Sequence, residues 1–576
     1  MSDTHTQGIP RLHDMDALRA FAMLLGIVLH CALSFSGEPW VVQDLKTNGM
    51  FGWINGAIHG FRMPLFMLVS GFFTMMLWRR RGLKALLKQR FQRIVIPLVL
   101  AMLTVIPALH WASTWAIETS LRQDARRRAS PGTTSDLVET VRQDDLAGLE
   151  RLLTGGADPN TIDAEFGVPT LTWAAMYGNV PAAKLLLDHG AQVNGTDKDG
   201  GYGPLHGAAF LGHAEMLDLL LQRGADPGLR SKRGETPRDS AKADWGATKF
   251  IAGIVRIPLR AREDLEGGRA ECRQLLARSS GEPEEVEANA GSQGWGLDAI
   301  RKGYAGFLSS DRFLVRLRPD WDPFHLVLSS VFDHLWFLWF LCWFVAGFAL
   351  LALLAERLAV PGLPRWLIIS PLRLIWLLPL TMVPQLVMGV FTPSFGPDTS
   401  TGLIPQPHLL VYYGIFFGFG ALYFDCDDRD GRLGRWWWAS IPLALLAWPV
   451  GIFTIGQTVA TGVAQVVFTW GMTFGMIGLF RRFLARENRT IRYVSDSAYW
   501  LYLTHLPLVI LLQLWVREWE LSAPLKFLLI FALVTGFLMI VYDMMVRYTW
   551  LGRILNGPRT RRVRVPVSGT ESAIAG

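Results

Sequence analysis

Long apolar runs are the sequence feature that most constrains the fold of this 576-residue chain. A run of about 17–25 apolar residues is long enough for a helix to cross the hydrocarbon core of a bilayer. A hydrophobic content of 51% and a mean hydropathy of +0.26 are too high for a soluble protein of this size. We therefore predict an all-α polytopic membrane protein with about ten transmembrane helices. The predicted spans cover residues 17–37, 50–77, 91–117, 333–355, 366–391, 407–424, 436–455, 459–484, 497–516 and 524–546.

The loops between these runs alternate in their content of Lys and Arg, which predicts the orientation of the chain. Cations gather on the N-terminal tail, after the second, fourth and eighth runs, and on the C-terminal tail. By contrast, 38–49 holds only Lys46, and 392–406 and 455–458 hold none. Because cytoplasmic loops are enriched in Lys and Arg, both termini are predicted to be cytoplasmic. The net charge of +7 is assigned to membrane topology, so no nucleic-acid partner is expected.

A long polar insertion between the third and fourth runs contains an internal repeat. RLLTGGADPN, KLLLDHGAQVN and DLLLQRGADPG align, and Gly156, Gly190 and Gly224 fall at intervals of 34. This period, together with the GPLHGAA segment at 203–209, resembles the ankyrin repeat. We predict an ankyrin-repeat domain, an α-solenoid, over 134–250. Such arrays are mainly interaction surfaces, so a protein or glycan partner is expected here and catalysis is not.

The chain on either side of the ankyrin domain divides into four further parts. Helices one to three lie in 1–117 and helices four to ten in 325–556, and the alternation of the loops places the ankyrin insertion on the outer side. Residues 251–324 form an extramembrane connector, in which 281–294 is polar and predicted to be flexible. A basic tail follows at 557–576.

The first apolar run carries Arg19 and His30 eleven positions apart, in DALRAFAMLLGIVLH. Along a helix this separation is about 16 Å, roughly half the hydrocarbon thickness. If Arg19 lies at the cytoplasmic face, His30 lies near the midplane, where an ionisable group is costly. A packing role against a neighbouring helix is the alternative, but function is favoured. A neutral imidazole can accept a proton from a hydroxyl nucleophile.

His505 lies at a similar depth in the ninth run, SDSAYWLYLTHLPLVI. It follows Ser495 and Asp496, the candidate N-caps of that helix, by about nine positions. A packing role just before Pro507 is an equal alternative. The chemistry of His505 therefore stays open on the residues alone.

Other polar residues mark the second and fourth runs. His334 begins the fourth run in FDHLWFLWF, where the residues alone favour an interfacial role in an aromatic belt. His59 and Arg62 are three positions apart on the second helix and can share a face. Ser70 and the following glycine would allow close approach of another helix.

Arg90 and Arg93 are three apart at the cytoplasmic start of the third run, and paired arginines suit phosphate groups. Spacing alone favours a simple anchoring role, because five other cations are adjacent. The sequence contains no HExxH, Walker loop, GxSxG or metal-ligand cluster, so no metal site is expected. Four widely spaced cysteines predict no disulfide framework: Cys31, Cys272, Cys342 and Cys426.

Five of these pieces, in this order, resemble the acyltransferase 3 family of multi-pass membrane O-acyltransferases. They are R-x10-H at Arg19 and His30, FRMPLFMLVSGFF at 61–73, the Arg90–Arg93 pair, HLWFL at 334–338, and SAYWLYLTHLPL at 497–508. The opening stretch and HLWFL look most like the glucans biosynthesis protein C branch. That branch is associated with succinylation of periplasmic glucans. The ankyrin insertion departs from the family pattern.

The resemblance implies a bacterial inner-membrane acyltransferase that moves a succinyl or acetyl group from cytoplasmic acyl-CoA to a hydroxyl of a periplasmic or cell-envelope glucan. It implies that His30 is catalytic with support from Arg19, that Arg90 and Arg93 meet the acyl-CoA, and that no cofactor is bound. The expected partners are therefore acyl-CoA, a carbohydrate acceptor and membrane lipid. His505, as an assisting catalytic residue, and His334 inherit roles less directly. The remaining substrate-binding candidates are Arg62 and Ser70.

Two functions of other classes remain open on the sequence. Intramembrane histidines and arginines also suit a transporter or exporter, although no inverted repeat relates the two halves. A membrane-anchored ankyrin receptor is the second alternative.

Overall fold

The computed structural model divides into two compact units, residues 1–116 with 294–576 and residues 117–293, called here the membrane unit and the ankyrin unit. Each unit has its own hydrophobic core. The structure describes residues 12–557 except 38–39, 129–135, 164–165, 199, 233, 244–247, 249–250, 253–254, 256, 281–295, 317, 319–322, 359–361 and 392–393. The segment 281–294, predicted to be flexible, and nearly all of the basic tail lie outside the described residues.

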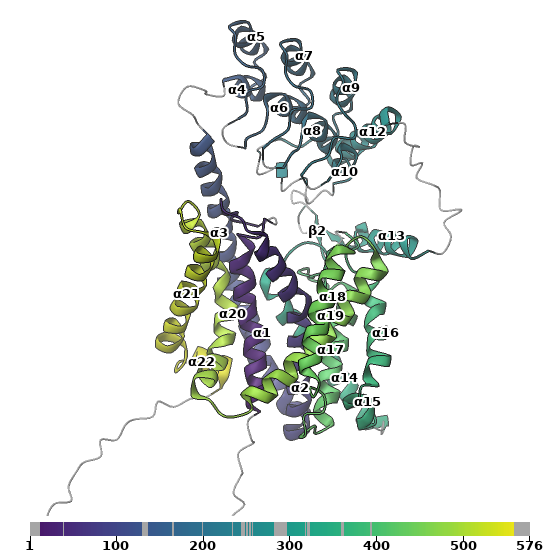
Figure 1. Ribbon diagram of the computed structural model, residues 1–576, viewed down its shortest axis with the longest axis vertical. Helices are drawn as coiled ribbons and strands as arrows, with labels where there is room; N and C mark the ends of the chain where they lie inside the picture. The colour runs from purple at the N-terminus through teal and green to yellow at the C-terminus, as the bar shows by residue number, and fades with distance from the viewer. Residues whose placement is uncertain are drawn as a thin grey trace, which may run out of the picture. The chain divides into compact units, whose positions relative to one another are not determined.

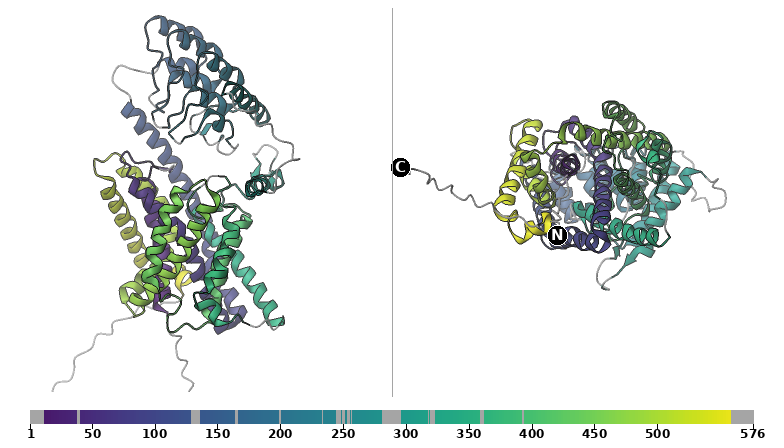
Figure 2. Two further views of the ribbon diagram at one scale, coloured as in Figure 1. Left: turned by 45° about the vertical axis from the view of Figure 1, so that its right-hand side comes forward. Right: turned by 90° about the horizontal axis from the view of Figure 1, so that it is seen from below.

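The membrane unit is built almost entirely of helices, as Figures 1 and 2 show. Its longer helices are α1 (His13–Leu33), α2 (Gly49–Arg90), α3 (Ile96–Arg128, which continues into the ankyrin unit), α13 (Leu297–Leu308), α14 (Trp336–Leu358), α16 (Arg373–Gln385), α17 (Pro407–Asp425), α18 (Trp437–Phe453), α19 (Thr458–Leu484), α20 (Arg489–Val516) and α21 (Ala523–Val541). Its short elements are η1 (Phe91–Val95), η2 (Asp311–Phe313), β1 (Leu314–Val315), β2 (Phe324–His325), η3 (Asp333–Leu335), α15 (Arg365–Ile369), η4 (Tyr542–Val546) and α22 (Trp550–Asn556). The two strands pair antiparallel, with Leu314 opposite His325.

Seven helical stretches of the described chain are long and apolar enough to cross a membrane. One of them, Gly49–Gln123, contains both the second and the third predicted spans. The two predicted spans outside these stretches correspond to α18, which has 17 residues, and to α15 with α16. Ser370 and Pro371 separate α15 from α16, because a proline and the residue before it disfavour a continuous helix. The chain is therefore an all-α polytopic membrane protein.

The helices α1, α2, α17, α19 and α20 form the centre of the membrane unit, and α1 packs against α2, α19 and α20. The second helix approaches α17 closely at two glycines. A Cβ on Gly71 would collide with the backbone of Phe417, and one on Gly420 would collide with the backbone of Leu68. Close approach of this kind is how membrane helices pack without large side chains between them. It fixes the position of α2, which carries Arg62.

The start of one helix and a break inside another differ from what hydropathy indicates. The expectation that Ser495 or Asp496 caps the ninth helix is wrong, because α20 begins at Arg489 and the Asn488 side chain accepts from the N–H groups of the first turn. The polar first two turns of α20 conceal its start from an apolar window. In α2, Gly82 has φ 75° and ψ 172°, so the segment that leads to Arg90 takes a new direction.

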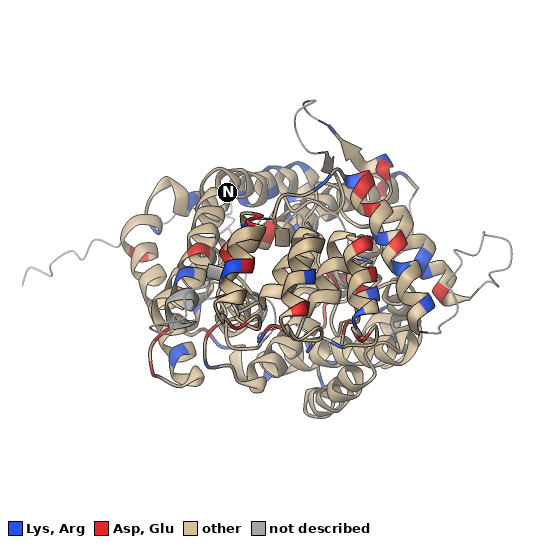
Figure 3. Ribbon diagram, turned by 90° about the horizontal axis from the view of Figure 1, so that it is seen from above, with Lys and Arg blue, Asp and Glu red and all other residues tan. Residues whose placement is uncertain are grey.

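The ankyrin unit stacks three helix pairs of the repeat at the predicted period of 34. The pairs are α4 (Asp136–Arg142) with α5 (Leu146–Thr154), α6 (Thr170–Tyr177) with α7 (Val180–Asp188), and α8 (Pro204–Leu211) with α9 (Ala214–Gln222). The short α10 (Pro237–Ser240) represents a fourth, degenerate copy, and α12 (Arg262–Ser280) packs on α8 and α9. Figure 3 shows Lys and Arg interspersed with Asp and Glu, but not on every helix of this unit: α6 and α8 carry no charged residue, and α9 carries only Glu215 and Asp218.

Hydrogen bonds repeat along this unit with the same period. The Asn160 side chain accepts from Gln192 N and donates to Gly190 O, and Asn194 does the same with Asp226 N and Gly224 O. Neighbouring repeats are therefore tied by side chain–backbone pairs as well as by the apolar core. The array lacks this ladder after its third copy, where Gly228 replaces the asparagine.

Candidate active site

A cavity of about 450 Å³ lies in the membrane unit among the beginnings of α1 and α20, the middle of α2, the α2–α3 junction and α14. We call it the cation-lined cavity, because Arg19, Arg90 and Arg93 all line it. Its other lining residues are Leu12, Asp16, Met23, Phe66, Ser70, Phe73, Met76, Leu77, Gln89, Ile94, Phe337, Leu338, Leu341, Ser495, Asp496, Tyr499, Leu555 and Asn556. Three arginines against two carboxylates give this cavity an excess of positive charge.

Each of the three arginines has a polar contact that holds it at the cavity wall. Arg90, the last residue of α2, donates from Nη2 to Thr74 Oγ1 of the same helix at 2.9 Å, across the break at Gly82. The backbone oxygen of Arg93 accepts from the hydroxyl of Tyr499 at 2.8 Å. Arg19 pairs with Asp16 on its own helix at 3.3 Å. Paired guanidinium groups at a cavity wall suit recognition of phosphate oxygens.

A second, small cavity of about 10 Å³, about the space that one water molecule needs, lies beside the first. It shares Met23, Phe66 and Phe337 with the cation-lined cavity, and its wall includes Arg62 and Tyr502. The two cavities therefore mark one direction, from the arginines toward the interior of the helix bundle.

Three histidines from three helices meet beyond Arg62, and we call them the histidine cluster. His30 of α1 and His505 of α20 approach to 2.7 Å between Nδ1 and Nε2. The ring of His334, from η3 at the start of α14, meets that of His505 edge to face at 5.7 Å. His334 is 9% exposed and His505 is fully buried, so both rings lie in the interior of the membrane unit.

The partners of His505 determine the tautomers in this cluster when the rings are neutral. His505 Nδ1 lies 2.8 Å from the carbonyl oxygen of Tyr502, and a carbonyl only accepts, so Nδ1 carries the proton. His505 Nε2 then accepts from His30 Nδ1–H. The remaining nitrogen of His30, Nε2, is left with its lone pair and has no hydrogen-bond partner among the described residues. The lone pair of His30 Nε2 is therefore available to accept a proton.

Prolines free backbone oxygens for two polar contacts at the centre of the membrane unit. Pro507 has no N–H, so the carbonyl of Leu503, four residues earlier, is left to accept from His334 Nε2 at 3.2 Å. In α2, Pro64 frees Gly60 in the same way, and Gly60 O accepts from Gln465 and Thr469 of α19. Because Pro507 has no N–H to donate, the carbonyl of Leu503 is free to hold His334 in place.

Trp40, in the segment between α1 and α2, covers the other side of His30. Its ring stacks on the imidazole with centroids 5.9 Å apart and an interplanar angle of 12°. Its Nε1 donates to Gln513 Oε1 at 2.9 Å, and Gln513 Nε2 donates to the backbone oxygen of His30. His30 is thus held by α20 on two sides.

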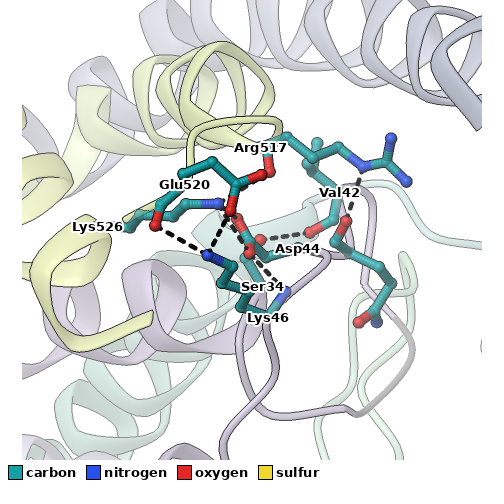
Figure 4. Close-up of polar contacts among 8 residues, drawn as sticks. Ser34, Val42, Asp44, Lys46, Arg517, Glu520 and Lys526 are labelled. Carbon is teal, nitrogen blue, oxygen red and sulfur yellow. Dashed lines mark hydrogen bonds and ion pairs between the residues drawn. The ribbon is translucent and has the colours of Figure 1, made fainter. Parts of the chain in front are cut away.

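A buried ion pair fixes the segment that carries Trp40. Lys526 Nζ of α21 lies 2.9 and 3.0 Å from the two carboxylate oxygens of Asp44 and donates to Arg517 O at 2.8 Å. The two side chains are 0% and 1% exposed. Lys46, nearby, forms a second pair with Glu520 that faces solvent (Figure 4). All three protons of the Lys526 ammonium group therefore have an acceptor.

The structure brings most of the predicted site residues into these two places. His30, His505 and His334 form the histidine cluster, whereas Arg19, Ser70, Arg90 and Arg93 line the cation-lined cavity. Arg62 lies between the two groups. His59 lies apart, against the loop that contains Gly396. The sequence analysis missed Trp40, Gln513, Tyr502 and the Asp44–Lys526 pair; the only signal for the last was a lysine inside an apolar run.

Two family models match the chain. A model described as an acyltransferase domain matches residues 12–133 and 291–543, which is more than half of the sequence. A model of three ankyrin repeats matches residues 137–231, inside the gap of the first.

Curated relatives match a shorter stretch. Proteins named glucans biosynthesis protein C from Salmonella paratyphi B, Salmonella heidelberg and Salmonella enteritidis PT4 are each 41% identical to the chain over 100 residues. That stretch is 17% of this chain and 25% of each relative. The chain thus aligns with about a quarter of the length of these relatives.

Proposed function

The chain belongs to the acyltransferase 3 family, and we propose that it is a membrane acyltransferase that moves an acyl group from acyl-CoA to a hydroxyl of a glucan. The single observation that carries the proposal is the arrangement of the cation-lined cavity, Arg62 and the histidine cluster as neighbours in one helix bundle. A polyanionic donor and a general base are the two groups that such a reaction needs. The name of the relatives supports a glucan as the acceptor.

The donor binds with its phosphates at Arg90 and Arg93. Its thioester then extends past Ser70 and Phe66 toward Arg62, along the direction in which the two cavities meet. Arg19 lies in the wall of the same cavity as Arg90, so it orients the donor rather than the acceptor. The acyl group is succinyl or acetyl.

The acceptor hydroxyl approaches His30 Nε2, which removes its proton as the oxygen attacks the thioester carbon. His505 holds the other ring nitrogen and stabilises the imidazolium that forms. The proton then passes to the sulfur of the leaving CoA. In this mechanism His334 is a positioning and lining residue, because it touches His505 and not His30.

Replacement of His30 tests the proposal directly. His30→Ala removes the base, so transfer of labelled acyl groups from acyl-CoA to glucan by the purified full chain should fall by about 10²–10⁴-fold. The matched control is His13→Ala, at the start of the same helix and outside the residues that line the cavity. Activity of the His30→Ala protein equal to that of the control would falsify the assignment.

We also propose where the molecule works. It lies in a bacterial inner membrane with both termini in the cytoplasm, so that Arg90 and Arg93 face cytoplasmic acyl-CoA, and the ankyrin unit lies in the periplasm with a protein or glycan partner. The alternation of cations along the sequence supports this orientation. A reporter that is active only in the periplasm, fused near Gly200, should be active; an inactive fusion with normal expression contradicts the orientation.

A further inference from the structure

Arg62 is a buried cation without a counter-charge. Its side chain lies in the middle of the membrane unit and is 8% exposed. Neither Nε nor Nη1 has a hydrogen-bond partner, and among the described residues no Asp or Glu forms an ion pair with it. A buried unpaired charge costs several kcal/mol, so such a residue requires an explanation beyond packing.

Other buried arginines of this chain show the contrast. Arg373 of α16 donates to the backbone oxygens of Ile369, Ser370 and Leu433. In the ankyrin unit, Arg269 donates to Phe210 O, Ala243 O and Thr248 Oγ1. Both guanidinium groups join segments of the fold through backbone acceptors, although the buried Nε of Arg373 has no partner. Arg62 joins nothing, so its guanidinium is not a structural connector.

The position of Arg62 is maintained by the absence of a side chain on α1. A Cβ on Gly26 would collide with Arg62 Nη1. Arg62 lines the small cavity, which shares its wall with the cation-lined cavity, and it lies within electrostatic reach of His30, His334 and His505. The free guanidinium therefore stands where the donor direction meets the proposed base.

We propose that Arg62 is a catalytic residue that binds the oxyanion formed from the thioester carbonyl. This inference rests on the proposed function. As the acceptor oxygen bonds to the carbonyl carbon, its proton moves to His30 Nε2 and the carbonyl electron pair moves onto oxygen, where Arg62 N–H groups donate to it. When the electron pair on this oxygen re-forms the carbonyl, the carbon–sulfur bond breaks and the CoA thiolate takes the proton from His30.

A cation that is unpaired at rest and paired in the transition state accelerates the reaction by differential binding. Interactions that exist only in the transition state raise kcat, whereas interactions already present in the ground state lower KM without raising kcat. Keeping the Arg62 charge buried without a partner lowers the stability of the fold, and the packing of Gly26 and Tyr502 around the side chain keeps it in place. Preorganised donors of this kind contribute about 10²–10³ to kcat.

The test uses the full-length purified protein with two donors, acetyl-CoA and succinyl-CoA, and a glucan acceptor. Arg62→Gln should lower kcat by about 10²–10³-fold with KM for the donor changed less than about threefold, and by the same factor for both donors. Arg62→Lys, which keeps the charge, should retain part of the activity. Gly26→Ala should also lower kcat, because the added methyl displaces the guanidinium while alanine favours the helix.

The matched control is Arg373→Gln, which removes a buried guanidinium at a distance from both cavities; its kcat relative to wild type should be unchanged in the folded fraction. A loss confined to succinyl-CoA would overturn the inference in favour of a carboxylate site, and a rise in KM with unchanged kcat would overturn it in favour of ground-state binding. If Arg62→Gln does not fold, Gly26→Ala decides: wild-type kcat in that variant overturns the inference. A wild-type protein that transfers neither acyl group refutes the proposed function instead.

Discussion

The ankyrin unit and the membrane unit both bury charged side chains, but the two units differ in how fully those side chains are hydrogen-bonded. In the ankyrin unit, Asp163 is 2% exposed and accepts hydrogen bonds from Phe166 N, Val168 N and Trp173 Nε1. Asp197, one repeat later, accepts from the corresponding backbone groups Gly200 N and Tyr202 N. These carboxylates close a turn, and nothing about them points to a ligand.

In the membrane unit, buried polar groups form two classes. Lys526 resembles Asp163, because each of its protons has an acceptor. In contrast, two buried nitrogens of Arg62 have no hydrogen-bond partner, and neither has the buried Nδ1 of His334. The comparison teaches that burial alone does not mark a functional residue. A buried polar group whose partners are complete should cost stability when removed, and one whose partners are missing should cost activity.

The largest effect is expected at His505, which orients His30. His505→Phe keeps a ring of similar volume but removes the acceptor for His30 Nδ1–H, so kcat/KM for acyl transfer should fall by about 10²–10⁴-fold. His505→Gln, which restores an acceptor oxygen, should recover part of the rate. Steady-state kinetics of the purified variants measures both. Equal activity of His505→Phe and wild type would show that His30 acts alone.

The Asp44–Lys526 pair should give the opposite signature, a loss of stability. Lys526→Met leaves the Asp44 carboxylate buried without its cation, and breaking a buried pair in this way costs about 3–5 kcal/mol. Thermal unfolding of the detergent-solubilised protein measures it. The matched control is Lys46→Met in the exposed pair with Glu520, which should change stability by less than about 1 kcal/mol. Similar stability losses in both variants would contradict the distinction.

Arg90 combines a partnered nitrogen with an unpartnered one, so its replacement should affect both stability and activity. Nη2 donates to Thr74, but the buried Nε has no partner. The double variant Arg90→Ala, Arg93→Ala should therefore raise KM for acyl-CoA about 10–100-fold and also lower stability by about 1 kcal/mol through the lost bond to Thr74. The control Arg482→Ala removes a cation near the end of α19 that does not line the cavity. Unchanged KM in the double variant would return both arginines to an anchoring role.

The sequence was sufficient for the fold class, the ankyrin repeat and the family, because each depends on a periodic or ordered pattern. Apolar runs and a 34-residue period can be recognised in the sequence without knowledge of three-dimensional contacts. The spacing of Arg19 and His30 likewise predicts two depths on one helix, and the structure places these residues at the cation-lined cavity and in the histidine cluster.

The sequence did not disclose contacts that depend on three-dimensional packing. His334 lies 171 positions from His505, and its role depends on a carbonyl that Pro507 leaves free. Trp40 and Gln513 are ordinary residues until the helices meet, and Lys526 is explained only when Asp44 is seen beside it. The start of α20 was missed for a similar reason, because Asn488 caps a polar turn outside the apolar run.

The smallest expected effect concerns a histidine of the ankyrin unit that is buried for structural reasons. His213 Nε2 lies 3.0 Å from the carbonyl of Met176 in the preceding repeat, and Gly178 leaves space for its ring. Burial, with a smaller contribution from the Arg260 charge, lowers the pKa of His213 from 6.5 to about 4. The folded unit therefore resists protonation of this ring, while the unfolded chain does not.

The sign of the pH dependence follows from that pKa. Above pH 6.5 the ring is neutral in both states and has no effect; as the pH falls from 6.5 toward 4, only the unfolded state takes up the proton, so the ankyrin unit loses about 1–2 kcal/mol by pH 5. Hydrogen exchange of α6 to α9 in the full chain should reveal this loss between pH 7 and 5. His213→Gln, which stays neutral and can still donate to Met176, should reduce it, whereas His189→Gln at an exposed position should not. Equal pH dependence in wild type and His213→Gln would place the sensitivity elsewhere. Acyl transfer measured at saturating donor should not change in either variant, because neither histidine belongs to the histidine cluster or lines the cation-lined cavity.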